Sequence, residues 1–387
     1  MSKSSLKRLV VAAISLAVLA PSIAPAQAAG EIKIGVITST SGPLASYGVA
    51  YNEGLTWGLN YYTGGKMAIN GKKLVVTSKD DGADPASATA SFKEMVGNGT
   101  KVIVGTASSG VALTLAPLAA QNKVLYISGP AKNDAVTSSA NRYVFRSGNS
   151  STQDLAPLAN IKPISGKKVV LFVEDNAFGA GNIGAARALM TSKGALFEEI
   201  KVPTSTSDFT PFAKKAADAK GAYIFIAWSN ALTAGAMLTS LKVQGAFAKQ
   251  RPITGLAGAA TYDIYGTLFD GTNAILTNSY FAGASNSGAA NDLATWYANN
   301  KKTQDLFTST GADAAKMIVM ALTKNPTQNV DTMIKNLEGK SWVGVKGLMT
   351  IDSTSHLLIQ PMFLVSLNKS GSRYVPKLLK TISGVGK

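Results

Sequence analysis

The sequence predicts an α/β protein made of two doubly wound lobes, each with a parallel sheet. Short β-branched or apolar runs alternate with helical stretches, which is typical of parallel sheets with right-handed crossovers. This alternation occurs in two successive series, with a break at residues 147–151. The chain has 387 residues, of which 46% are hydrophobic and 16% are charged, so it is long and apolar enough for two cores.

The first series covers residues 31–146. Apolar residues at helical spacing predict a helix over 45–62. Asp84 followed by Pro85 predicts the start of a second helix, with Asp as the cap and Pro in the first turn. Short apolar runs predict strands at 31–37, 74–77, 102–104, 124–127 and 143–146.

The second series follows the break and gives way to a helical region after residue 280. Its predicted strands are 168–173, 196–202, 222–228 and 253–256. Its predicted helices are 178–193, one that starts at 210, and 232–243. The remaining elements are predicted helices at 293–297, 312–322 and 330–337, a hairpin at 342–351, and a final strand at 362–367.

Residues 101–130 are the most informative stretch for function. A β-branched strand is followed by small hydroxylated residues, among them Ser108 and Ser109, and then by an Ala- and Leu-rich helix. A helix N-terminus of this kind gathers free N–H groups and favours an anion. The next strand ends in a similar loop, Ser128, Gly129 and Pro130. Both loops would lie at the carboxyl edge of the sheet, where ligands of open α/β sheets bind. The simpler interpretation is that Ser108 and Ser109 only cap the helix.

Residues 1–28 are predicted to be a cleaved signal peptide. A basic start precedes an apolar core at 9–20, which is too short to span a bilayer, and Ala-Gln-Ala at 26–28 is typical of a cleavage site. No later stretch predicts a membrane span. The chain has no cysteine, so disulfides, a thiol nucleophile and a lipidated cysteine are excluded. We therefore expect an unanchored protein in the periplasm.

The inventory of chemical groups argues against an enzyme. With one histidine, His356, and no cysteine, the chain offers no Ser-His-Asp triad and no metal cluster. It also lacks the Gly-rich phosphate-binding patterns, so no cofactor is expected. The acidic pairs at 80–81 and 174–175 are interpreted as caps of the turns that follow. The formal charge is +16, but the lysines are scattered and the chain is predicted to be exported, so no nucleic-acid partner is expected.

Several motifs, in their order and spacing, resemble those of one family. They lie at 34–48 (IGVITSTSGPLASYG), 64–85, 102–117, 169–181 (VVLFVEDNAFGAG), 222–228 and 311–315. Together they cover nearly the whole mature chain. The chain resembles solute-binding proteins of the branched-chain amino-acid type, which serve ABC importers.

The resemblance implies the clamshell of type I periplasmic binding proteins. One lobe would comprise residues 30–147 and 282–358, and the other residues 148–281 and 359–387. Three chain crossings would join them, near 146–147, 280–282 and 358–363, and closure would be a rotation about these crossings. The expected partners are a small carboxylate in the cleft and an importer permease in the inner membrane, and the expected state is a monomer.

The resemblance also assigns binding roles. In such proteins the first lobe grips the ligand carboxylate, here with Ser108, Ser109 and the loop 128–132. The cleft is further lined by aromatic residues, here Tyr47 from the first lobe and Phe178 and Trp228 from the second. The simpler interpretations are a core position for Trp228 and a surface position for Tyr47.

Two positions depart from the pattern of amino-acid binders. Ala257 stands where these proteins carry the acid that holds the ligand ammonium, and a buried ammonium without its partner would cost several kcal/mol. Lys132 stands where they have Ser or Thr, although a lysine is more often solvated than buried. Together the departures predict an anionic ligand without an α-amine, and the aromatic residues expected at the cleft favour an aromatic acid. The alternatives are an amino-acid binder in which Asp263 holds the ammonium, and the ligand-binding part of a receptor.

Overall fold

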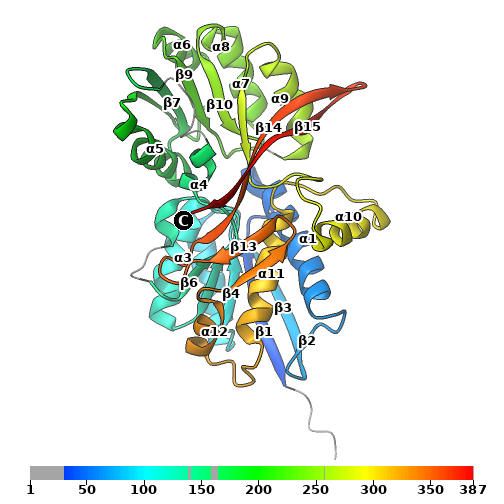
Figure 1. The fold of residues 1–387 in the computed structure, drawn as a ribbon. Coiled ribbons are helices and arrows are strands. Elements are labelled where there is room, and N and C mark those ends of the chain that lie inside the picture. Colours follow the sequence, from blue (N-terminus) through cyan, green and yellow to red (C-terminus); the bar gives the residue numbers. More distant parts are fainter. Residues whose placement is uncertain (1–29, 138–140, 158–163, 257, 387) are drawn as a thin grey trace, which may run out of the picture.

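The computed structural model describes residues 30–137, 141–157, 164–256 and 258–386 (Figure 1). The predicted signal peptide lies outside these residues. The described chain forms two α/β units that lie end to end (Figure 1). None of the helices in these described ranges combines the length and the apolar character that a membrane crossing requires.

The first unit contains a six-stranded sheet in the order β2-β3-β1-β4-β5-β6, parallel except for β2 against β3. Its strands are β1 (Glu31–Thr38), β2 (Ala68–Ile69), β3 (Lys72–Asp80), β4 (Val102–Gly105), β5 (Leu125–Ser128) and β6 (Val144–Arg146). Its helices are α1 (Ala45–Tyr62), α2 (Pro85–Gly97), α3 (Ser109–Asn122), α10 (Gly288–Asn299), α11 (Thr308–Leu322) and α12 (Val330–Leu337). The helices α1, α11 and α12 bury one sheet face, while α2 and α3 bury the other.

The second unit is built on the parallel strands β8-β7-β9-β10-β11, which continue into antiparallel β14 and β15. These strands are β7 (Lys168–Glu174), β8 (Leu196–Val202), β9 (Tyr223–Ala227), β10 (Arg251–Gly255), β11 (Ile275–Asn278), β14 (Leu358–Ser370) and β15 (Arg373–Val385). Its helices are α4 (Ser151–Leu155), α5 (Ala177–Met190), α6 (Thr210–Asp218), α7 (Ala234–Val243), α8 (Ala246–Lys249) and α9 (Tyr262–Phe269). Helix α5 covers one sheet face, and α6 to α9 cover the other.

Elements with strong local signals form where the sequence predicts them. The bounds of α1 and α12 match the predictions, and Ser87 N–H donates to the Asp84 carboxylate (2.8 Å), as expected of a capped helix start. The predicted hairpin forms from β12 (Ser341–Gly344) and β13 (Gly347–Ile351). The two-lobe α/β fold class is confirmed, with mixed and mostly parallel sheets.

The end of the chain was predicted only in part, since the strand expected at 362–367 lies within β14 but the strand that follows it was not expected. A single short strand was expected at 362–367, but the structure has the long hairpin of β14 and β15, turning at Gly371 (φ +60°). Most β15 side chains are exposed. An exposed strand does not require alternating apolar residues, so the sequence carries little signal for it.

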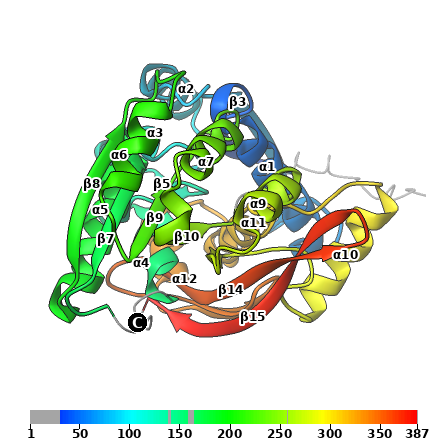
Figure 2. The ribbon, with the colours of Figure 1, turned by 90° about the horizontal axis from the view of Figure 1, so that it is seen from above.

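Strand β14 runs from one unit to the other (Figures 1 and 2). It pairs with β13 at its start and with β11 farther along. Two buried glutamines tie this passage to the segment after β6. Gln153 Nε2 donates to the carbonyls of Leu358 and Val385 (both 2.7 Å), and Gln360 Nε2 donates to the carbonyl of Gly148 (3.1 Å). The residue limits of the two lobes stay a prediction.

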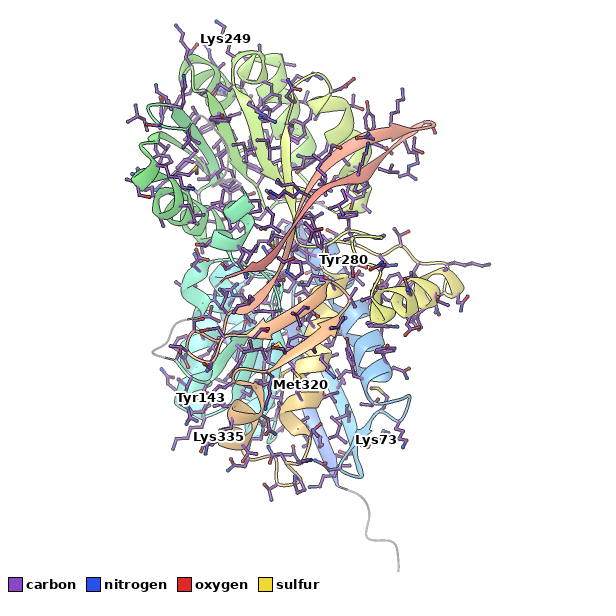
Figure 3. All side chains as sticks on the ribbon, viewed as in Figure 1. Lys73, Tyr143, Lys249, Tyr280, Met320 and Lys335 are labelled. Atoms are coloured by element: carbon purple, nitrogen blue, oxygen red, sulfur yellow. The ribbon has the colours of Figure 1, made fainter. Side chains whose placement is uncertain are left out.

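Positive charge is spread over the outer surface. Lys73, Lys249 and Lys335 are exposed and project away from the molecule at widely separated places (Figure 3). Tyr280, in contrast, is buried at the junction of the two units (Figure 3).

Candidate ligand-binding site

A cavity of about 520 Å³ lies between the two units. The first unit contributes the loops that follow β1, β4 and β5, and the second contributes the carboxyl ends of β7, β9 and β10. This is the edge at which open α/β sheets bind ligands. Of the predicted site residues, the cavity brings together Tyr47, Ser108, Ser109, Pro130, Lys132, Phe178 and Trp228.

The hydroxyl of Ser109 is held in place by two backbone donors. The N–H groups of Lys132 and Asn133 donate to Ser109 Oγ at 3.3 and 3.2 Å, and the residue is only 4% exposed. A hydroxyl has two acceptor positions and one donor. Its acceptor positions are filled and it has no acceptor of its own among the described residues, so its hydrogen is available to a ligand oxygen in the cavity.

Ser108 caps helix α3 and also lines the cavity. Its Oγ accepts from Val111 N–H (3.4 Å), so Ser108 does cap the helix, as the simpler interpretation predicts, and it lines the cavity as well. The first turn of α3 leaves backbone N–H groups without intrahelical partners. Because the positive end of the helix dipole points the same way, this loop suits an anion.

A buried carboxylate behind the loop was missed by the sequence analysis. Asp81 is 1% exposed and accepts from Thr106 Oγ1 and from Ser39 Oγ (2.6 Å). Thr106 Oγ1 in turn accepts from Ser108 N–H (3.3 Å). Asp81 Oδ1 also accepts from Ala83 N–H (2.8 Å), so the expected capping of the following turn is present, and the contacts with Ser39 and Thr106 are additional to it. Its position behind Thr106 follows from the side-by-side pairing of strands that are distant in sequence.

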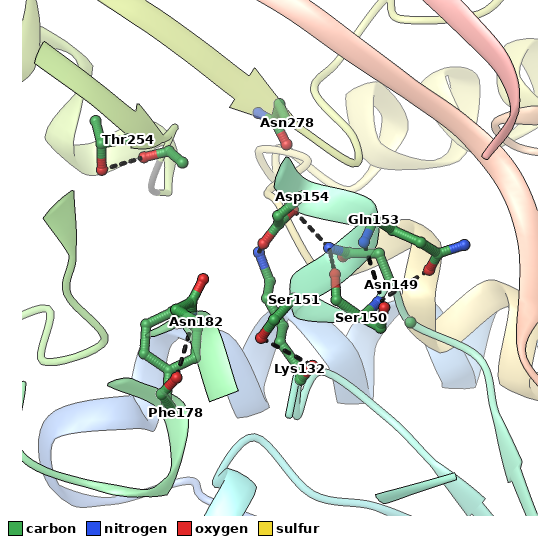
Figure 4. A network of polar contacts seen from close by, with 12 residues as sticks. Lys132, Asn149, Ser150, Ser151, Gln153, Asp154, Phe178, Asn182, Thr254 and Asn278 are labelled. Atoms are coloured by element: carbon green, nitrogen blue, oxygen red, sulfur yellow. Dashed lines mark hydrogen bonds and ion pairs between the residues drawn. The ribbon is translucent and has the colours of Figure 1, made fainter. Parts of the chain in front are cut away.

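Lys132 is enclosed in the cavity wall. Its Nζ lies 2.7 Å from Asp154 Oδ2, and the two side chains are 12% and 10% exposed (Figure 4). Asn149 Nδ2 donates to the other oxygen of Asp154 (2.6 Å), and Lys132 Nζ also lies 5.8 Å from the Phe307 ring centroid. The lysine charge is thus neutralised by a carboxylate from the short helix α4, a partner that the sequence analysis did not identify.

Aromatic side chains from both units form the apolar walls. Trp228 packs edge-to-face on Phe209 (5.5 Å between centroids), and its Nε1 donates to Thr233 Oγ1 (3.1 Å). On the other side Tyr47 meets Phe307 edge-to-face at 5.2 Å. Phe307 was not predicted, because it lies far along the chain in the segment between α10 and α11, where no local pattern marks a ligand site.

Glu174 joins two strand ends at the back of the cavity. It is 1% exposed and accepts from the N–H groups of Ser229 (2.9 Å) and Asn230 (3.1 Å), and from Asn176 Nδ2 (3.1 Å). The cap of α5 is Asn176, whose Oδ1 accepts from Gly179 N–H. The prediction that Glu174 caps the following turn is therefore wrong, and the carboxylate instead ties β7 to the segment after β9.

Three predicted site residues are not seen on the cavity wall. Ser128 is fully buried beneath it, and Gly129 packs against Tyr51, where an added Cβ would lie 3.0 Å from the ring. Ala257 lies outside the described residues. Its neighbours Gly255 and Leu256 line the cavity and carry no charge.

The acid proposed as an alternative partner for an ammonium points elsewhere. Asp263 does not line the cavity; it accepts from Tyr374 N–H (2.7 Å) and lies 3.3 Å from Arg373 Nε, beside the β14–β15 hairpin. The carboxylates that do line the described part of the wall, Asp154 and Glu174, already have the partners given above. Within the described ranges, no three His, Asp or Glu side chains gather in a way that could hold a metal.

Comparison with known proteins gives a consistent family. A family model described as periplasmic binding protein matches residues 31–372. Leu/Ile/Val-binding protein homolog 3 of Brucella melitensis is 27% identical over 255 residues, which cover 64% of this chain and 67% of that protein. Homolog 6 of Brucella abortus is 29% identical over 233 residues, 57% of this chain and 56% of its own length.

Solved structures share the whole fold. A branched-chain amino acid ABC transporter protein from Rhodopseudomonas palustris CGA009 is 28% identical with a TM-score of 0.76, covering 92% of this chain and 97% of its own. A solute-binding protein from Rhodopseudomonas palustris HaA2, in complex with p-hydroxybenzoic acid, has a TM-score of 0.79 at 20% identity, with the same coverage. The family model matches residues 31–372, and the fold agrees with it. The chain therefore belongs to the periplasmic binding protein family, whose members bind solutes rather than catalyse reactions.

Proposed function

We propose that the protein is the solute-binding component of an ABC importer and that its ligand is a small aromatic acid without an α-amine. The ligand would be captured between the two units and delivered to a membrane permease. The predicted signal peptide and the family support a protein that acts in the periplasm, and we propose that it acts as a monomer.

The main observation in favour of a ligand carboxylate is the hydrogen bonding of the Ser109 hydroxyl. With both acceptor positions filled by backbone N–H groups, it can only donate, and a ligand carboxylate accepts strongly from such a donor. The N-terminus of α3 lies on the same wall and favours negative charge, and the Lys132 ammonium, although its charge is paired with Asp154, has further N–H donors for a ligand oxygen. We assign Ser108, Ser109 and Lys132 to the carboxylate end of the ligand.

The absence of an α-amine is inferred from the carboxylates of the described wall. Asp154 is paired with Lys132, and Glu174 accepts from two backbone N–H groups, so neither is left for a ligand ammonium. The apolar walls at Phe178, Trp228 and Phe307 favour a flat ring, because offset or edge-to-face aromatic pairs each contribute about 0.5–1.5 kcal/mol beyond area burial. The Rhodopseudomonas palustris protein with p-hydroxybenzoic acid is an example of this fold holding such a ligand.

The second candidate is a branched-chain amino acid. It is favoured by the names of the Brucella relatives and of the 28% identical structure. In that case the Asp154 or Glu174 carboxylate would have to accept the ligand ammonium in addition to its present donors.

A thermal-shift panel separates the two candidates. A ligand present at 100 times its Kd stabilises the protein by about 2.7 kcal/mol, which gives a clear rise in melting temperature. We expect benzoate, 4-hydroxybenzoate or a phenyl-substituted keto acid to raise it, and leucine to have little effect. A large shift with leucine and none with the aromatic acids would contradict the proposed ligand and support the amino acid.

A further inference from the structure

Direct hydrogen bonds join the two units beside the cavity, and of the four residues that make the two contacts described here only Ala177 lines the cavity. Asn133, which follows β5 in the first unit, donates from Nδ2 to the carbonyl of Ala177 at the start of α5 (2.6 Å). Asp305, which precedes α11 of the first unit, accepts at Oδ1 from the N–H of Ala259 after β10 (2.9 Å). Both contacts therefore link a loop of the first unit to a segment of the second unit that follows a strand end.

Each contact lies against a glycine that leaves room for it. A Cβ added at Gly181 would lie 2.8 Å from Asn133 Nδ2 and 3.2 Å from its Cα. A Cβ added at Gly258 would lie 2.8 Å from Asp305 Oδ2. Neither glycine has a positive φ, so what each provides is space for the opposite unit rather than an unusual backbone conformation.

Both contacts are connected to the cavity wall within one residue. The backbone N–H of Asn133 donates to Ser109 Oγ (3.2 Å), and Ala177 directly precedes Phe178. Asp305 Oδ1 also accepts from the N–H of the next residue, Leu306, which lines the cavity. A change in either contact would therefore alter the distance between the two walls rather than the chemistry of the ligand contacts.

We propose that Asn133 and Asp305 are positioning residues that hold the two units closed around the ligand and so determine how long it stays bound. Losing one net hydrogen bond should lower the ratio of closed to open protein about two- to tenfold. The affinity for every ligand should fall by the same factor, through a faster dissociation rate at an unchanged association rate. The predicted changes in ligand affinity and dissociation rate rest on the proposed function, whereas the change in the ratio of closed to open protein does not.

Cross-linking tests the contact without any ligand. The chain has no cysteine, so a pair can be introduced as Asn133→Cys with Gly181→Cys, and the first change removes the Asn133 amide that the new Cβ would otherwise meet. The matched control is Asn133→Cys with Gly184→Cys, since Gly184 lies on the same helix and a Cβ there would meet nothing within 4 Å. Mild oxidation should form a disulfide in the first variant only. A folded first variant that does not cross-link, or equal cross-linking in both, would overturn the proposal.

Single substitutions test the effect on closure. With an acid from the thermal-shift panel that binds wild-type protein, Asn133→Ala and Gly181→Ala should each accelerate dissociation about two- to tenfold, and Gly184→Ala should not. If wild-type protein binds none of the acids, the proposed ligand fails, while cross-linking still decides the contact. Unchanged dissociation in both variants would refute the positioning role.

Discussion

Ser109→Ala removes a hydroxyl that we assign to the ligand carboxylate. The Oγ is enclosed, and the N–H groups of Lys132 and Asn133 donate to it at 3.3 and 3.2 Å. The substitution therefore has two separable effects. It removes a donor to the ligand, and it leaves two backbone N–H groups without their acceptor.

The expected magnitudes differ for binding and stability. A hydrogen bond to a charged group contributes about 1.5–3 kcal/mol, which corresponds to binding weakened by roughly tenfold to 150-fold. The N–H groups that lose Ser109 Oγ each add a cost of about 1–3 kcal/mol to folding, toward the lower end where water from the cavity can replace the hydroxyl. The melting temperature should consequently fall as well.

Isothermal titration calorimetry with an acid that binds wild-type protein measures the first effect, and thermal unfolding measures the second. Ser240→Ala on α7 is the control, because its Oγ is buried, has no hydrogen-bond partner among the described residues and does not line the cavity. It should leave the affinity unchanged. If Ser109→Ala lowers the melting temperature but keeps wild-type affinity, the carboxylate site lies elsewhere and the assignment is wrong.

Three further predictions follow from the site and the junction. Trp228→Leu should weaken an aromatic acid about two- to tenfold, as expected for one lost aromatic pair; calorimetry with a non-aromatic acid as control should show a smaller loss. Saturating ligand should lower the radius of gyration of wild-type protein in scattering, and no change with binding confirmed would contradict closure. Burial raises the pKa of Asp313 to about 6, although Lys346 Nζ, 3.1 Å away, lowers it. The stabilisation that comes from this raised pKa is fully present below about pH 3.9, the pKa of the group in the unfolded chain, and it is lost as the pH rises through about 6. The melting-temperature difference between wild type and Asp313→Asn should fall over that window, and a constant difference would contradict it.

Local signals were sufficient for much of the fold. The helices at 45–62 and 330–337 follow from apolar spacing, and the start of α2 follows from Asp84 and Pro85. These predictions succeed because spacing and capping act within a few residues. The serine loop before α3 could be placed at the sheet edge for the same reason, since strand, loop and helix are consecutive in the chain.

The exposed strand β15 and most polar partners in the cavity carried no such signal. Asp154 neutralises Lys132 from a five-residue helix, and Phe307 meets Tyr47 from a segment far along the chain. The sequence by itself determined the two α/β series, the family resemblance and the serine loop. Only the tertiary structure decided which carboxylates were already paired and which residues join the two units. Those pairings depend on how two separately built sheets come together, which no local pattern specifies.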